Sequence, residues 1–202
     1  MTLIWRKQVR TFTCIFVWLI FSGVLPAQQE TLISGDIENG GFGGPVCKIG
    51  SVYQEAALMI GGRGGWVINH QFVLGAGGYG LMTDIASKED SNLEMNMGYG
   101  GVEIEYIKRP NKLIHLSFMT LLGGGGAGFS EHHTSDWDEN YEYDTFFIAE
   151  PSVHMMLNVT EFFRIGLGGS HRFVTGINNG SELSNSDLSG PTLIITLKFG
   201  NF

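Results

Sequence analysis

Cysteine is almost absent from this sequence of 202 residues, which contains two, Cys14 and Cys47. Cys14 lies inside an N-terminal apolar stretch, so a chain that loses this stretch keeps Cys47 alone. A single cysteine cannot form a disulfide framework, a cysteine-based zinc site or a Cys-x-x-Cys redox motif within one chain. We expect Cys47, which lies in a strand-like run, to be a buried or lipid-facing side chain.

Basic residues are also scarce, since 12 Lys and Arg stand against 20 Asp and Glu. Without a basic surface to neutralise phosphates, nucleic-acid binding is excluded. Only 5 prolines and no Gly-x-y period exclude collagen, and 43% hydrophobic residues exclude a disordered chain. The sequence is instead rich in glycine, with 30 residues. Each glycine costs a helix about 1 kcal/mol, so the composition favours a β protein.

The N-terminus has the pattern of a secretory signal peptide over residues 1–27. Arg6, Lys7 and Arg10 precede an apolar stretch at 12–25, which is shorter than the roughly 20 residues of a membrane helix. Pro26 and Ala27 then mark the cleavage site. We expect a short periplasmic segment at 28–40 to follow. The alternative is an uncleaved N-terminal anchor.

Beyond residue 40 the apolar residues alternate along the chain, and no segment has a 3.6-residue period. This pattern predicts β-strands. Most of them reach the roughly 9–11 residues with which a tilted strand crosses a bilayer. The connections alternate between tight turns, near 69–70, 109–111 and 158–160, and longer polar loops at 85–92, 129–143 and 177–189. Short turns at one end and long loops at the other are typical of outer-membrane barrels. The eight strands are expected at 41–50, 54–67, 70–84, 93–108, 112–128, 144–157, 161–176 and 190–200.

The alternation also separates two faces. Leu58, Ile104, Phe118 and Leu167 are examples of the apolar face, and the opposite face carries the charges. A polar inside and an apolar outside indicate a barrel with lipid as its solvent. The interior of eight strands is just wide enough for side chains, and buried charges need partners. We therefore predict a paired charge network that fills the lumen, rather than a pore, from Arg63, Glu103, Glu105, Glu150, Arg164 and Lys198.

Three stretches resemble the small eight-stranded outer-membrane β-barrels, the OmpA/OmpX-like class, and in particular glycine-rich barrels of Gram-negative bacteria. They are the runs at 40–45 (GGFGGP) and 61–66 (GGRGGW) and the ending at 197–202 (LKFGNF). The resemblance covers residues 40–202. It implies an all-β, antiparallel, up-and-down transmembrane barrel in the cell outer membrane. It also implies that outer-membrane lipid surrounds the barrel and that the barrel-assembly machinery recognises a terminal Phe such as Phe202, although Phe202 is out of phase with Leu197 and Phe199.

The loop at 131–144 is the most distinctive polar segment. Asp136, Asp138 and Asn140 imitate the start of a calcium loop, but Tyr141 takes the position of its glycine and no Glu follows at its end. These three residues are weak metal candidates. The simpler interpretation is a solvated loop, and divalent cations or a surface ligand are its candidate partners.

The sequence favours a non-enzymatic barrel, without a cofactor, that has a structural or surface-interaction role through its extracellular loops. Two alternatives stay open. One is a lipid A-modifying barrel enzyme, for which the histidine and serine candidates are His132, His133, Ser135, Ser170 and His171. The other is a secreted soluble β-barrel that binds a ligand.

Overall fold

The computed structural model describes residues 38–88, 92–131, 143–177 and 182–202. The predicted signal peptide, most of the predicted 28–40 segment and the metal candidates Asp136, Asp138 and Asn140 lie outside these ranges and stay predictions. Among the described residues, no helix is long and apolar enough to cross a bilayer.

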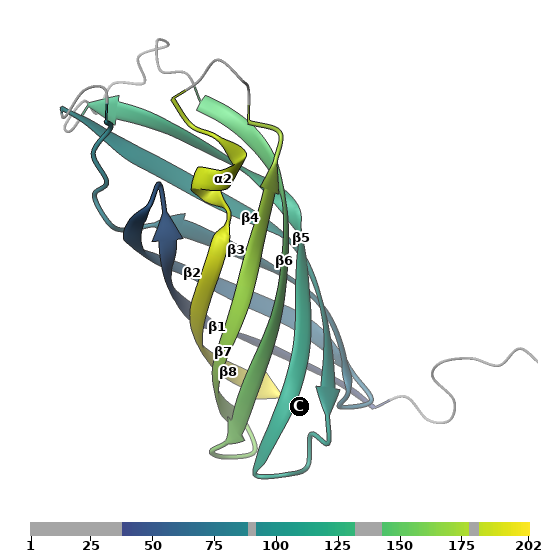
Figure 1. Ribbon diagram of the computed structural model, residues 1–202. Helices are drawn as coiled ribbons and strands as arrows, with labels where there is room; N and C mark the ends of the chain where they lie inside the picture. The colour runs from purple at the N-terminus through teal and green to yellow at the C-terminus, as the bar shows by residue number, and fades with distance from the viewer. Residues whose placement is uncertain (1–37, 89–91, 132–142, 178–181) are drawn as a thin grey trace, which may run out of the picture. The chain divides into compact units, whose positions relative to one another are not determined.

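Eight antiparallel strands form a closed barrel, because each strand pairs with its neighbour in sequence and β1 also pairs with β8 (Figure 1). Closure leaves no sheet edge with unpaired backbone groups, which hydrocarbon would penalise heavily. The strands are β1 (Asn39–Val52), β2 (Glu55–Ile68), β3 (Phe72–Leu81), β4 (Leu93–Lys108), β5 (Ile114–Glu131), β6 (Tyr143–Asn158), β7 (Phe163–Thr175) and β8 (Gly190–Asn201).

The predicted fold class is confirmed, with one strand at each predicted position. The bounds differ most in β3, which is shorter than the predicted 70–84, and in β5, which ends three residues after the predicted 128. β1 begins at Asn39, so its first two residues belong to the barrel and not to the segment before it. A short helix, α2 (Asn185–Leu188), lies in the predicted loop before β8, where a capping box between Ser184 and Asp187 supports its first turn.

Two of the short connections contain a pair of residues with positive φ. Tyr53 and Gln54, at 54° and 66°, join β1 to β2, and Asn69 and His70, at 49° and 58°, join β2 to β3. Two consecutive residues with positive φ form the turn that best matches the right-handed twist of a hairpin. These turns are tight enough to bring neighbouring strands directly together.

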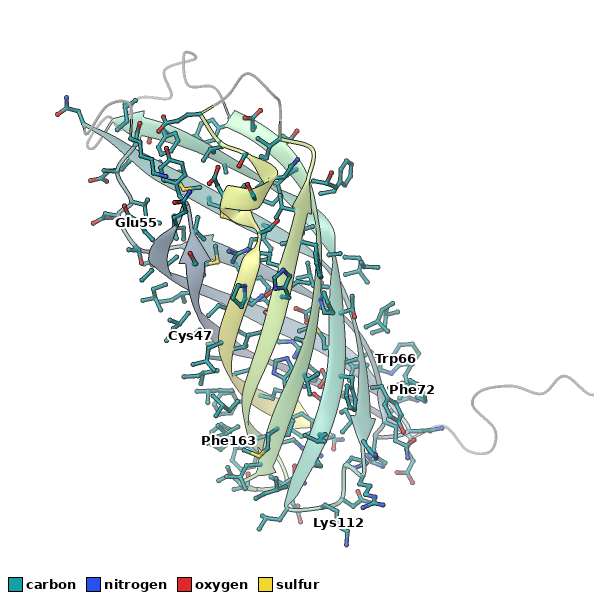
Figure 2. The ribbon with its side chains drawn as sticks, in the orientation of Figure 1. Cys47, Glu55, Trp66, Phe72, Lys112 and Phe163 are labelled. Atoms are coloured by element: carbon teal, nitrogen blue, oxygen red, sulfur yellow. The ribbon has the colours of Figure 1, made fainter. Side chains whose placement is uncertain are left out.

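The outside of the barrel is an apolar belt bordered by aromatic residues. Mid-strand residues such as Ile195 and Leu167 are 40% and 47% exposed. Phe163 and Phe173 lie ten residues apart on β7. At about 3.4 Å per residue and a tilt of about 40°, they span about 26 Å, close to the roughly 25 Å apolar band of membrane barrels. Trp66 extends the aromatic border on β2, near the short turns (Figure 2).

Glycines make room inside the barrel for large polar side chains. A Cβ on Gly77 would lie 2.4 Å from Oε1 of Glu103, and a Cβ on Gly168 would lie 2.6 Å from Nδ1 of His154. Neither distance is possible without a shift. Glu103 and His154 therefore occupy the space that side chains at positions 77 and 168 would otherwise fill.

Candidate functional site

A cluster of buried charges lies in the half of the lumen nearer the short turns. Arg63 on β2 donates to Glu103 at 2.6 Å and to Glu105 at 2.9 Å, both on β4. Lys198 on β8 reaches the same Glu105 at 2.7 Å. Glu105 therefore bridges two cations from strands on either side of β1.

A second cluster centres on Glu150 of β6. Lys48 on β1 lies 2.7 Å from Glu150 Oε2, and the Tyr99 hydroxyl donates to the same oxygen at 2.8 Å. Ser170 donates to the other carboxylate oxygen at 2.6 Å. The Lys48 ammonium also lies 3.5 Å from the centre of the Tyr79 ring.

Tyr79 connects the two clusters. Its hydroxyl donates to Glu103 at 2.6 Å, while its ring carries Lys48. Glu103, Glu150 and Lys48 are each 1% exposed or less. Charges removed from water to this extent are stable only when paired and hydrogen-bonded, so the strands must keep this register. We call the set the lumen network, which consists of Lys48, Arg63, Tyr79, Tyr99, Glu103, Glu105, Glu150, Ser170 and Lys198.

The structure brings five of the six predicted lumen residues into this network. The sixth, Arg164, faces the interior but forms no ion pair with the residues that the structure describes. Its guanidinium stacks on the ring of Phe202 at 3.9 Å, and its Nε has no hydrogen-bond partner there. Arg172, near the loop end, is held by backbone carbonyls instead, donating to Leu188 at 2.7 Å and to Ser51 at 2.9 Å.

Four members of the network, Lys48, Tyr79, Tyr99 and Ser170, are absent from the predicted lumen set, although Ser170 was named as an enzyme candidate. The sequence could have identified Lys48, because Val46 and Lys48 alternate with Cys47 and so share the inward face of β1. Tyr79 and Tyr99 carry no charge, and only their position opposite the glutamates identifies them. Cys47 is half-buried on the outward side of the same strand.

A serine–histidine pair, Ser152 and His154, lies beside Pro151, which interrupts the pairing of β6 with β7. The β6–β7 pairing passes from Ala149–Phe173 to Ser152–Ser170 without the two pairs between, since proline has no N–H to donate. An open pocket of about 500 Å³ lies there, with Ser152 and His171 among its lining residues. Ser152 Oγ lies 2.9 Å from Nε2 of His154.

The Ser152–His154 pair lacks a third catalytic member. Nδ1 of His154, the atom that an orienting carboxylate would contact, has no partner among the described residues. Of the enzyme candidates taken from the sequence, Ser170 belongs to the lumen network. His171 packs on the Phe173 ring at 4.5 Å on the outer face. His132, His133 and Ser135 lie outside the described residues.

The loop end of the barrel is tied together by Glu182. The Tyr53 hydroxyl donates to its carboxylate at 2.5 Å, and Ser87 Oγ and the Lys88 backbone N–H donate to it as well, at 2.7 and 2.8 Å. Burial, followed by the hydrogen bond to Glu182 and its charge, raises the pKa of Tyr53 to about 12. These contacts fix the segment before α2 against the β1–β2 hairpin.

No group of three or more His, Cys, Asp or Glu side chains within the described ranges is arranged to hold a metal ion. The predicted candidates Asp136, Asp138 and Asn140 are outside these ranges, so the metal hypothesis for that loop is untested.

Comparisons with known proteins were made by sequence and by structure. No protein-family model and no curated protein sequence matches the chain. Solved structures do match. Neisserial surface protein A has a TM-score of 0.60 at 10% identity, over 82% of this chain and 99% of that one. The N-terminal β-barrel domain of Pseudomonas aeruginosa OprF has a TM-score of 0.53 at 10% identity, with the same two shares. Ail, the attachment invasion locus protein of Yersinia pestis, has a TM-score of 0.50 at 11% identity, over 80% and 97%.

Identity this low establishes the fold alone, which is that of the small eight-stranded outer-membrane barrels. The apolar belt agrees with this fold, since a surface of exposed Leu, Ile, Val and Phe around a charged interior suits a bilayer and not water. The chain thus has the fold of the outer-membrane β-barrels of the OmpA/OmpX-like class.

Proposed function

We propose that this protein is a non-enzymatic outer-membrane barrel with a sealed lumen, which acts through the surface at its loop end in a structural or surface-interaction role. The observation that carries the proposal is the lumen network, in which cations and carboxylates from β1, β2, β4, β6 and β8 are joined across the interior. A conducting pore needs charges that face water, whereas these face one another.

Charge at the loop end supports a surface role. The segments 53–55, 82–94, 131–144 and 176–189 contain 13 Asp and Glu but only one basic residue, Lys88. Segments of this composition attract partners of opposite charge. Divalent cations that bridge the loops to anionic outer-leaflet glycolipids, or a basic surface ligand, fit this composition best. Two of the similar structures are those of a surface protein and of an attachment invasion locus protein, which agrees with this proposal.

The terminal strand supports a role for the barrel-assembly machinery in biogenesis. Phe202 follows directly on β8 and stacks on Phe42 of β1 with ring centres 5.9 Å apart. β8 and β1 are the strands whose pairing closes the barrel. A residue at the end of β8 that is recognised by the assembly machinery before this pairing would be released to pack against Phe42 as the barrel closes.

The test is conductance of the purified, refolded barrel in a planar bilayer, together with mass spectrometry of lipid A from cells with and without the gene. We expect no steady single-channel current and an unchanged lipid A profile. Steady currents, or a lipid A change restored by the gene, would overturn the sealed, non-enzymatic barrel.

Titration of the reconstituted barrel with calcium chloride, with a 132–142 deletion as the control, tests the cation partner.

The second candidate is a lipid-modifying enzyme, and the Ser152–His154 contact at 2.9 Å beside the Pro151 pocket is the observation that favours it. A serine within hydrogen-bonding distance of a histidine base is the core of nucleophilic catalysis. If this candidate is right, Ser152→Ala and His154→Ala abolish a lipid A change that the wild-type gene produces. The variant Ser117→Ala, at another buried lumen serine, leaves the change intact.

A further inference from the structure

The basic residues of the barrel are unevenly placed. Nine Lys and Arg follow residue 27, and five of them lie buried inside the barrel. Lys88 lies at the loop end. The other three, Lys108, Arg109 and Lys112, all belong to the hairpin between β4 and β5, at the end with the short turns. The exposed positive charge of that end is therefore concentrated at one hairpin.

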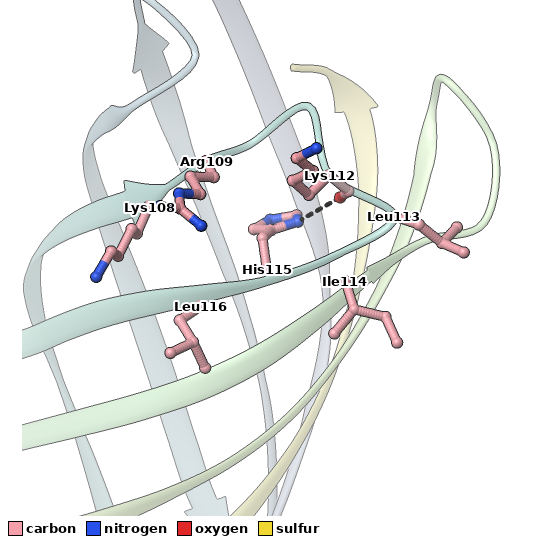
Figure 3. Close-up of a pocket in the computed structure, with 7 residues that line it drawn as sticks. All are labelled: Lys108, Arg109, Lys112, Leu113, Ile114, His115 and Leu116. Carbon is pink, nitrogen blue, oxygen red and sulfur yellow. Dashed lines mark hydrogen bonds between the residues drawn. The ribbon is translucent and has the colours of Figure 1, made fainter.

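These cations lie beside apolar side chains on the outside of the barrel. Lys108 pairs with Leu116 across the β4–β5 ladder, and both are exposed. Leu113 and Ile114, which lead into β5, are 66% and 58% exposed. Figure 3 shows the basic and aliphatic side chains leaving the same hairpin, where they line an open pocket of about 580 Å³.

The hairpin is held in place by hydrogen bonds and is not a loose tip. Asn158 Nδ2, from the end of β6, donates to the carbonyls of Pro110 at 2.9 Å and Lys112 at 3.0 Å. His115 Nδ1 lies 3.2 Å from the same Lys112 carbonyl (Figure 3). The Lys112 N–H donates to the Arg109 carbonyl at 3.0 Å. The cations thus project from a backbone that is already fixed.

The depth of the hairpin matches the headgroup region of a membrane. Tyr106, two residues before Lys108, is 41% exposed and pairs its ring with that of Phe72 at 5.3 Å. Aromatic residues of this kind mark the border of the apolar band. The Lys108 side chain starts just beyond that border, where a long basic side chain can reach phosphates while its methylenes stay on apolar surface.

We propose that the β4–β5 hairpin is a binding site for an anionic phospholipid of the leaflet at the short-turn end. Its phosphate is held by Lys108, Arg109 and Lys112, and its acyl chains lie along Ile114 and Leu116. Charge complementarity identifies the headgroup as anionic. Continuity of the aliphatic side chains with the lipid-facing belt identifies the ligand as a lipid and not as a free anion.

The neighbouring short turns lack this combination, which makes the site local. The β2–β3 turn pairs His70 with Glu38, and the β6–β7 turn carries the acidic Glu161 beside exposed Val159 and Phe162. We therefore expect one preferred anionic lipid per barrel at this end, and not a uniform ring of them.

Native mass spectrometry of the detergent-folded barrel tests the site, with phosphatidylglycerol as the probe and phosphatidylcholine of the same chain length as its neutral counterpart. The variants are Lys108→Gln and Lys112→Gln, and Lys88→Gln is the control that removes one charge from the opposite end. Heat-dependent gel mobility shows that each variant is folded.

We expect each hairpin variant to bind phosphatidylglycerol about fivefold more weakly, which is the contribution of one basic residue at an anionic lipid surface. Phosphatidylcholine binding should not change, and the Lys88→Gln variant should behave as the wild type.

Two results would overturn the proposal. The first is an equal loss of phosphatidylglycerol in the Lys88→Gln control and in the hairpin variants, or no loss in either. The second is displacement of the lipid by inorganic phosphate at comparable concentration, which would identify a simple anion site without a lipid component.

Discussion

Glu105 is the position at which the lumen network is most sensitive to a single change. It is 1% exposed and contacts two cations, Arg63 at 2.9 Å and Lys198 at 2.7 Å. In the variant Glu105→Gln, Arg63 keeps its second carboxylate, Glu103, at 2.6 Å. Lys198 keeps no carboxylate within the described chain, because both of its hydrogen bonds are to Glu105 and its other contact, the Phe42 ring at 4.4 Å, is uncharged. The variant therefore leaves one buried ammonium without a counter-charge.

The expected cost follows from that unpaired ammonium. Two charges about 4 Å apart at an effective dielectric constant of about 20 attract by about 4 kcal/mol, and breaking one partner from a buried pair costs about 3–5 kcal/mol. We expect Glu105→Gln to lower the free energy of unfolding by this amount. The double variant Glu105→Gln/Lys198→Met removes both charges and should recover at least half of the loss, because a buried pair and an apolar replacement of similar volume are close in stability.

Urea unfolding and refolding in lipid vesicles, followed by the gel mobility of the folded barrel, measures these free energies. Glu55→Gln, at an exposed position in β2, is the matched control and should change stability by less than about 0.5 kcal/mol. The reasoning fails if Glu105→Gln costs no more than this control. It also fails if adding Lys198→Met deepens the loss.

Three further outcomes are expected from the same refolding assay and from titration. Ile195→Arg, near the middle of the apolar band, should cost about 2–4 kcal/mol, and Ile114→Arg, near the interface, at most about 1 kcal/mol; equal costs would contradict the assigned depths. Gly77→Ala places a Cβ 2.4 Å from a buried carboxylate oxygen and should cost about 1–3 kcal/mol, whereas Gly78→Ala, with open space around its Cβ, should be neutral or slightly stabilising. The difference in ultraviolet absorbance between the wild type and Tyr53→Phe should show one phenol that ionises near pH 12. Because the folded pKa of Tyr53 lies above the unfolded value of 10.0, its contribution to stability is complete below pH 10 and is lost as the pH rises towards 12; ionisation near pH 10 would refute the burial of this ring.

The strands and their two faces were determined by the sequence alone. Alternation with a period of two is a local property, since successive side chains of a strand point to opposite sides. It is therefore readable at Glu103 and Glu105 or at Ile195 without knowledge of the rest of the chain. Turn lengths are local too. They established that each strand pairs with the next one along the chain, and that one end of the barrel carries short turns and the other carries long loops.

Partners across the lumen were decided only by the tertiary structure. Lys48 and Glu150 are 102 residues apart in sequence, and they meet because β1 and β6 face each other across a barrel whose closure sets the height of each residue. If the pairing of two neighbouring strands shifted by two residues, each side chain would stay on the same side of the barrel wall. Its partners across the shifted pair would change. For the same reason the sequence could place Arg164 in the lumen but could not show that Phe202, and not a carboxylate, would cover its guanidinium. Local alternation decides which side of the wall a residue occupies, and the accumulated stagger of eight strands decides what it meets there.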